Sequence, residues 1–149
     1  LSANPPAWLA NPNTAFWANL SVDVWLGIPF MALAFLAGMQ GISPDYYEAA
    51  QIDGAGALQR LYYITLPFLR PVILVATLLS VMWTFNDFNV IYIITKGGPM
   101  NTTDILVTYL YKTAFQFLEF SPASVMAFIT FIILLGFSLA YARLYFKEG

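Results

Sequence analysis

The chain has 149 residues and too few charged side chains to cover a water-exposed surface. It is 60% hydrophobic and 9% charged, whereas soluble domains contain about 25% charged residues. Its net charge of −2 and its lack of a basic stripe exclude a nucleic-acid partner. Cysteine and histidine are absent, which excludes disulfides, thiolate metal sites and histidine-dependent catalysis and predicts no metal site and no cofactor.

The amino-terminal segment does not have the features of a signal peptide. The chain starts with Leu1 and carries neither a basic n-region nor a small-residue cleavage site. We therefore expect the chain to be part of a longer polypeptide. Residues 1–17 are rich in proline and asparagine, which predicts an ordered or semi-ordered loop.

Three apolar segments are long enough to cross a bilayer, which takes about 20 helical residues. They cover about residues 18–39, 71–95 and 122–144. Helix is the expected form because hydrocarbon offers no water to satisfy open backbone groups. The predicted fold is all-α: a polytopic membrane protein with three transmembrane helices.

Basic residues predict how the chain is oriented in the membrane. They are distributed over the first loop (Arg60, Arg70), the second loop (Lys96, Lys112) and the carboxy-terminal tail (Arg143, Lys147). Cytoplasmic segments carry an excess of such residues, so the first loop and the carboxy terminus are expected in the cytoplasm. In the second loop, the turn signal at residues 96–99 precedes an apolar run over residues 105–120. Lys112 argues against a span there, and we expect a helix lying in the outer interface.

The first loop, residues 43–71, predicts a helix-turn-helix. Ser43 is a suitable helix cap, Pro44 suits the first helical position, and Asp45 favours the positive end of the helix dipole. Gly54 is able to end this helix in a left-handed conformation. A second short helix is expected over about residues 57–65, stopping near residues 66–67.

This loop carries a family resemblance. Glu48-Ala49-Ala50, three further residues, Gly54, nine further residues and then residues 64–67 (Ile-Thr-Leu-Pro) resemble the EAA loop of bacterial ABC importer permeases. In that family the loop is the coupling helix that docks on the ATP-hydrolysing subunit. The resemblance implies a contact formed by Glu48, Ala49, Ala50, Asp53 and Gly54. The alternative is an ordinary amphipathic connector.

The rest of the chain resembles the carbohydrate-importer branch, the maltose and sugar permeases. The segments at residues 23–25, 27–30, 97–99 and 103–107 are similar to motifs of these proteins in the same order. The resemblance implies the carboxy-terminal half of a multi-pass permease in the bacterial inner membrane, importing a sugar-like solute by alternating access. The implied partners are ATP-binding cassette ATPase subunits, a second permease subunit and an extracytoplasmic solute-binding protein. The chain has no GxxxxGK[ST] run, so we expect a transport subunit without a nucleotide site, not an enzyme.

A polar stripe runs along the second predicted span. Ser80, Trp83, Thr84 and Asp87 follow the i, i+3, i+4, i+7 spacing of one helix face. An aspartate at membrane depth should face protein or water. Hydroxyls and a carboxylate exchange hydrogen bonds with sugar hydroxyls, and an indole covers apolar C–H surface. The stripe therefore predicts a sugar pathway.

Resemblance to maltose-type permeases places the sugar-contacting positions on this stripe and on Leu26, Gly27 and Phe30 of the first span. Other interpretations remain open. Ser80 and Thr84 are also suited to bonding backbone or a neighbouring helix, Trp83 to packing, and Asp87 to anchoring a partner permease or lying hydrated near the outer interface. Two further hypotheses are an intramembrane enzyme that uses Asp87 and a membrane assembly or scaffold subunit, which would leave the EAA pattern unexplained.

Overall fold

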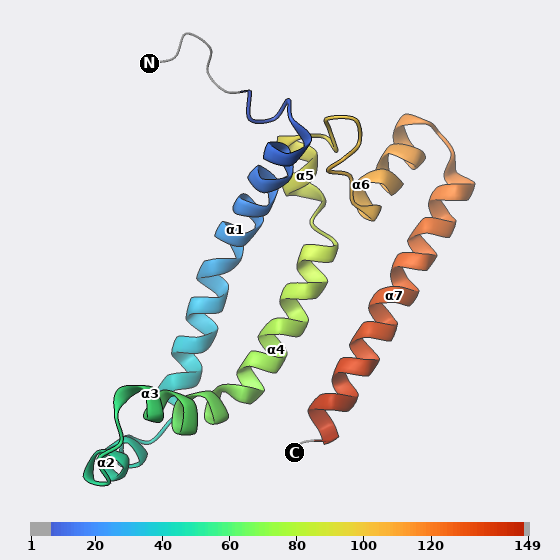
Figure 1. The fold of residues 1–149 in the computed structure, drawn as a ribbon. Helices are drawn as coiled ribbons and strands as arrows, with labels where there is room; N and C mark the ends of the chain where they lie inside the picture. Colours follow the sequence, from blue (N-terminus) through green and yellow to red (C-terminus); the bar gives the residue numbers. More distant parts are fainter. Residues whose placement is uncertain (1–6, 148–149) are drawn as a thin grey trace, which may run out of the picture.

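The chain folds entirely into helices and turns within the part that the structure describes. The computed structural model describes residues 7–147, with side chains as far as residue 143. Three of its helical stretches are long and apolar enough to cross a membrane: Pro12–Gln40, Ala57–Phe85 and Phe120–Arg143. They run alongside one another between two compact ends (Figure 1). The predicted all-α fold with three candidate membrane spans is confirmed.

The first long helix, α1 (Pro12–Gln40), begins six positions before the predicted span at residue 18. The Asn11 side chain accepts a hydrogen bond from the Asn13 N–H at 2.9 Å, and Pro12 occupies the first turn. An asparagine cap followed by proline is a helix-start signal. The predicted loop over residues 1–17 is therefore wrong from residue 12 onward. Its residues 1–6 lie outside the described part of the chain.

The second predicted span is shifted toward the amino terminus and is broken near its end. Helix α4 (Leu66–Phe85) stops at Asn86, and a separate helix, α5 (Phe88–Ile94), follows. Asp87 lies at the break, where its carboxylate accepts a hydrogen bond from the Val90 N–H at 3.2 Å. The expectation of one helix over residues 71–95 is wrong because Asp87 caps a new helix instead of continuing the old one.

Helix α1 and helix α4 pack closely at the end that carries the first loop. A β-carbon at Gly38 would come within 2.6 Å of a Leu69 methyl carbon. Glycine at this position therefore lets the two helices approach, as small residues do in membrane proteins. Helix α7 (Phe120–Lys147) packs on the other side of α4, where the Ser138 hydroxyl lies 3.8 Å from the Met82 sulfur.

The first loop forms the α2–α3 end of the molecule, at the bottom of Figure 1. Helix α2 (Pro44–Ile52) begins after Ser43, whose hydroxyl accepts from the Asp45 N–H at 3.3 Å. Gly54 has a φ of +77°. The predicted cap, first-turn proline and left-handed glycine are thus confirmed.

The second short helix does not stop where we expected. Helix α3 (Ala57–Arg60) continues through a π-helical turn, η1 (Leu61–Thr65), directly into α4. Pro67 lies just after this turn, inside the continuous helical stretch, where its missing N–H removes a hydrogen bond to the preceding turn. The wider π-helical turn before Pro67 allows the helical stretch to bend at this point.

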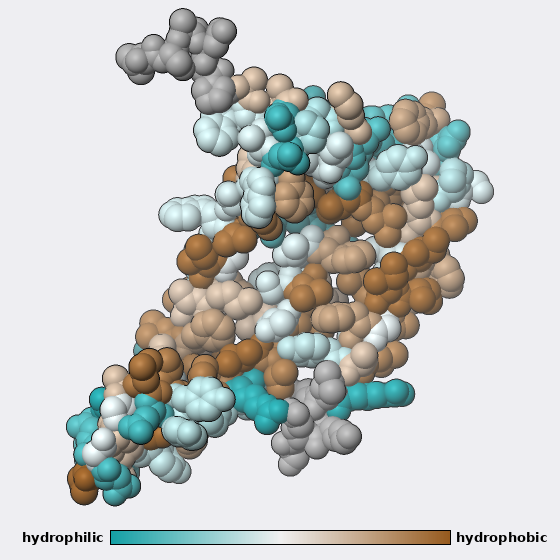
Figure 2. Space-filling model, in the orientation of Figure 1, coloured by the Kyte–Doolittle hydropathy of each residue, from teal (hydrophilic) through white to brown (hydrophobic). Residues whose placement is uncertain are grey.

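The opposite, α5–α6 end contains α5, the turn at residues 96–105, α6 (Leu106–Tyr111) and a second π-helical turn, η2 (Lys112–Gln116). A helix was expected in this loop, and one is present. It begins at Leu106, one residue after the start of the apolar run over residues 105–120. Polar side chains gather at both ends of the molecule, while apolar ones cover the long helices between them (Figure 2).

Candidate functional site

A groove between α1 and α4 brings together all seven residues predicted to line the pathway. The groove has a volume of about 560 Å³. Leu26, Gly27 and Phe30 reach it from α1, whereas the others come from α4 and the break after it: Ser80, Trp83, Thr84 and Asp87. Their common location is a finding, and their contact with a solute remains a prediction.

One wall of the groove is aromatic. The rings of Phe30 and Trp83 meet across the two helices with centroids 4.7 Å apart and planes at 69°. Such an edge-to-face pair stabilises packing and leaves ring surface available for further contact. Trp83 is 54% exposed within the chain. The pair gives the groove an apolar surface.

The polar wall of the groove contains a carboxylate that the predicted set did not include. Asp23 accepts a hydrogen bond from the Thr84 hydroxyl at 3.4 Å. Asp87 lines the same groove. Asp23, Leu26, Gly27 and Phe30 are spaced i, i+3, i+4, i+7. The same spacing argument that found the α4 stripe would have found Asp23.

The α2–α3 end presents the five residues predicted to contact an ATPase. Ala50 is partly buried, and the rest are exposed: Glu48, Ala49, Asp53 and Gly54. Apolar side chains stand beside them with little cover, Ile52 being 87% and Leu58 80% exposed. This end therefore offers a mixed polar and apolar surface beyond the tips of the long helices.

Few contacts join α2 to the helices behind it. The Tyr47 hydroxyl lies 2.9 Å from the hydroxyl of the buried Thr65 in the π-helical turn. The rings of Tyr46 and Phe68 lie 5.0 Å apart. Both contacts end on the stretch that runs on into α4, so a displacement of α2 would be passed to that helix.

Comparison with known proteins identifies the family. A family described as the inner membrane component of binding-protein-dependent transport systems matches residues 4–147. The chain belongs to this permease family. It is therefore an inner-membrane, multi-pass transport component and not an enzyme, and the resemblance read from the EAA loop is confirmed.

Individual relatives of this permease chain include transporters named for sugars. The chain is 41% identical over 92% of its length to a probable ABC transporter permease protein of Brucella suis, and it covers 47% of that protein. The trehalose/maltose transport system permease protein MalF of Thermococcus litoralis is 38% identical over 96% of the chain, which covers 48% of it. The sulfoquinovosyl glycerol transport system permease protein SmoG of Agrobacterium fabrum is 36% identical over 92% of the chain, which covers 44% of it. The chain thus spans about half the length of these relatives.

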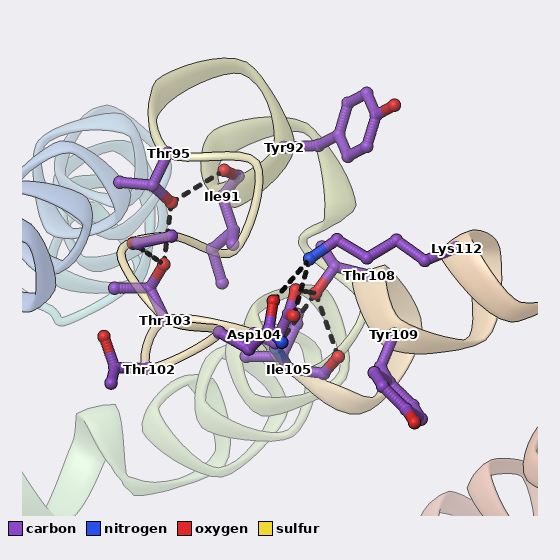
Figure 3. A network of polar contacts seen from close by, with 12 residues as sticks. Ile91, Tyr92, Thr95, Thr102, Thr103, Asp104, Ile105, Thr108, Tyr109 and Lys112 are labelled. Atoms are coloured by element: carbon purple, nitrogen blue, oxygen red, sulfur yellow. Dashed lines mark hydrogen bonds and ion pairs between the residues drawn. The ribbon is translucent and has the colours of Figure 1, made fainter. Parts of the chain in front are cut away.

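The α5–α6 end of this permease chain is held by a buried polar network, drawn in Figure 3. Lys112 is 9% exposed and donates to Asp104 at 2.6 Å. Asp104 also accepts from the fully buried Thr108 hydroxyl at 3.0 Å. Lys112 was expected only to keep this loop out of the membrane. Its pairing depends on a tertiary contact, which no local sequence signal reveals.

Proposed function

We propose that the chain is the carboxy-terminal half of a permease subunit that imports a sugar or sugar-like solute into the cytoplasm. The observation that carries this proposal is the groove, where an aromatic pair faces hydroxyls and carboxylates from two membrane-length helices. Two relatives named for trehalose/maltose and sulfoquinovosyl glycerol transport support the solute class.

Recognition would use both walls of the groove. Sugar hydroxyls donate to the carboxylates of Asp23 and Asp87 and exchange hydrogen bonds with Ser80 and Thr84. The apolar C–H face of the ring covers Trp83 and Phe30. In this interpretation Leu26 and Gly27 shape the α1 side, and Gly27 leaves room because a β-carbon there would have nothing within 4 Å.

Energy for transport would come from separate ATP-binding cassette ATPase subunits docked on the α2–α3 end. Glu48, Ala49, Ala50, Asp53 and Gly54 form the contact in this proposal, and exposed Ile52 adds apolar area. The bond between Tyr47 and Thr65 gives the ATPase a mechanical connection to α4. Because α4 also carries Ser80, Trp83 and Thr84 of the groove, movement of α2 would open or close the groove.

The remaining partners follow from the same scheme. The α2–α3 end and the carboxy terminus lie in the cytoplasm, and the α5–α6 end faces an extracytoplasmic solute-binding protein. A second permease subunit packs against the long helices. Single cysteines at positions 58 and 100, where the native side chains are 80% and 90% exposed, test this orientation. An impermeant thiol reagent should label position 100 but not 58 in intact cells, and the reverse pattern would overturn it.

Uptake by the full-length transporter in proteoliposomes tests the groove. Asp87→Leu should lower uptake by at least about tenfold, because unpaired sugar hydroxyls cost about 1–3 kcal/mol each. Trp83→Ala should also lower uptake, because it removes the apolar surface that the sugar ring would cover. Basal ATP hydrolysis should persist in both variants. Trp25→Ala is the matched control, since Trp25 is 73% exposed on α1 and does not line the groove. Parental uptake rates in both groove variants would contradict the proposal.

A further inference from the structure

A second, smaller cavity adjoins the groove at the α5–α6 end. We call it the acidic compartment. Its volume is about 210 Å³, and Asn19, Asp23, Thr84 and Asp87 are among the side chains that line it. Asp23, Thr84 and Asp87 line the groove as well, so the two spaces meet at the carboxylate pair.

One polar atom at the compartment lacks a partner. Asn19 is only 6% exposed. Its amide nitrogen donates to the Thr95 hydroxyl at 3.1 Å, which directs the oxygen away from Thr95. That oxygen, Oδ1, is buried without a hydrogen-bond partner among the described residues. A buried acceptor of this kind destabilises a fold unless a donor or a cation satisfies it.

The charges around the compartment all have one sign. Asp23 and Asp87 both line it, and among the described residues no lysine or arginine does. Asp104 also borders it, but Lys112 and Thr108 already occupy its two oxygens. The carboxy-terminal end of α4, at Phe85, adds the negative end of a 20-residue helix dipole beside Asp87, opposite the amino terminus of α5, where the Val90 N–H bonds one Asp87 oxygen.

We propose that the acidic compartment binds one positively charged group, either an inorganic cation or the ammonium group of the transported solute. The Asn19 oxygen and the Asp23 and Asp87 carboxylates supply its ligands. Oxygen donors with carboxylate charge suit hard cations and ammonium groups alike. The volume accommodates an ion with water, a water molecule taking about 30 Å³. Because the groove and the compartment share lining residues, an amine on a solute in the groove could reach the same oxygens. Of the two cation sources, only the ammonium group of the solute rests on the proposed function.

The test uses the full-length permease in its assembled transporter, reconstituted in nanodiscs for binding and in proteoliposomes for uptake. One arm measures equilibrium binding of radioactive sodium and calcium ions without solute. The other compares uptake of sugars carrying a free amine with uptake of their N-acetylated forms and of neutral sugars. Saturable ion binding identifies an inorganic cation, and preference for the free amine identifies the solute's ammonium group.

Variants test whether ion binding or amine preference arises from the acidic compartment. Asp23→Asn combined with Asp87→Asn should weaken the signal by more than about tenfold, because two nearby charges are lost. Asn19→Leu should weaken it less. Glu119→Gln removes an exposed carboxylate elsewhere at the same end and should leave it unchanged. If the double variant does not assemble, Asp23→Asn alone replaces it.

Two results would overturn the proposal: a parental transporter with neither ion binding nor amine preference, or a signal that survives the loss of both carboxylates. Neutral-sugar uptake by the parental transporter reports separately on the proposed function. Normal neutral uptake without any cation signal would refute only the acidic compartment, whereas cation binding without sugar uptake would refute only the sugar assignment.

Discussion

The two ends of the molecule are held together in opposite ways. At the α5–α6 end, buried polar side chains satisfy one another, with Asp104, Thr108 and Lys112 at the centre (Figure 3). The hydroxyls of Thr95 and Thr103 lie 2.8 Å apart and connect α5 to the turn at residues 96–105. At the α2–α3 end, α2 is attached mainly by Tyr46 and Tyr47, and apolar side chains such as Ile52 stand exposed.

This difference indicates that the α5–α6 end is stabilised by contacts within the chain, whereas the α2–α3 end would be stabilised by contacts with a partner. A network of buried polar groups fixes one arrangement because each member is costly to leave unpaired. Exposed apolar side chains and few internal contacts are typical of a surface on which a partner docks. We therefore call the α5–α6 end the rigid end and the α2–α3 end the mobile end, and we propose that the second moves with a partner.

Breaking the ion pair of the rigid end should have the largest effect. Lys112→Met leaves the buried Asp104 carboxylate unpaired, which costs about 3–5 kcal/mol. The fraction of full-length protein that survives detergent extraction and its thermal unfolding midpoint should both fall. Lys96→Met, a change at an exposed lysine in the preceding turn, is the matched control and should have little effect.

The double variant sharpens this result. Asp104→Leu with Lys112→Met removes both charges, so it should recover much of the stability lost in Lys112→Met. Equal destabilisation by Lys112→Met and Lys96→Met would show that the pair does not hold this end together.

The turn of the mobile end should give an intermediate effect. Gly54→Val places a side chain at a φ of +77°, which costs about 1–2 kcal/mol and lowers the population of the native turn by up to about 5–30-fold. Solute uptake should fall by a similar factor while membrane insertion and basal ATP hydrolysis persist. Gly56→Val is the control, because Gly56 has a φ of −68°. Equal uptake in the two variants would refute a role for the turn in coupling.

The smallest effect is expected from the bond that ties α2 to α4. Tyr47→Phe removes one hydrogen bond, worth about 1 kcal/mol, while Thr65 keeps its contact with the Arg60 carbonyl at 3.4 Å. ATP hydrolysed per solute imported should rise by less than about fivefold. Tyr46→Phe, at an exposed tyrosine, should leave this ratio unchanged. If Tyr47→Phe and Tyr46→Phe give the same ratio of ATP hydrolysed to solute imported, the bond between Tyr47 and Thr65 has no role in coupling.

Local signals in the sequence predicted the mobile end well. Ser43, Pro44 and Gly54 act through their own backbone and its nearest neighbours, so their roles could be identified without a structure. The cap at Asn11 was equally local, and its signal was present in the sequence although a loop was expected there.

The rigid end was predicted less well. The break at Asp87 has a local signal, because the polar residues Asn86, Asp87 and Asn89 interrupt the apolar run, but these residues were interpreted as part of one continuous span. Lys112 lies eight residues after Asp104, more than two helical turns, and only the turn at residues 96–105 brings them together. At Gly97 a β-carbon would collide with the Asp104 carboxylate, which explains a glycine that the sequence marked only as a turn.

The most direct test of the account asks whether the groove between α1 and α4 holds the solute. The chain has no native cysteine, so Ser80→Cys, in the groove, can be compared with Ser124→Cys, exposed on α7 away from it. A small water-soluble thiol reagent should modify position 80 in the assembled transporter, and a transported sugar should slow that reaction. Position 124 should show no such protection. Labelling of position 80 that the sugar does not change would contradict the central claim.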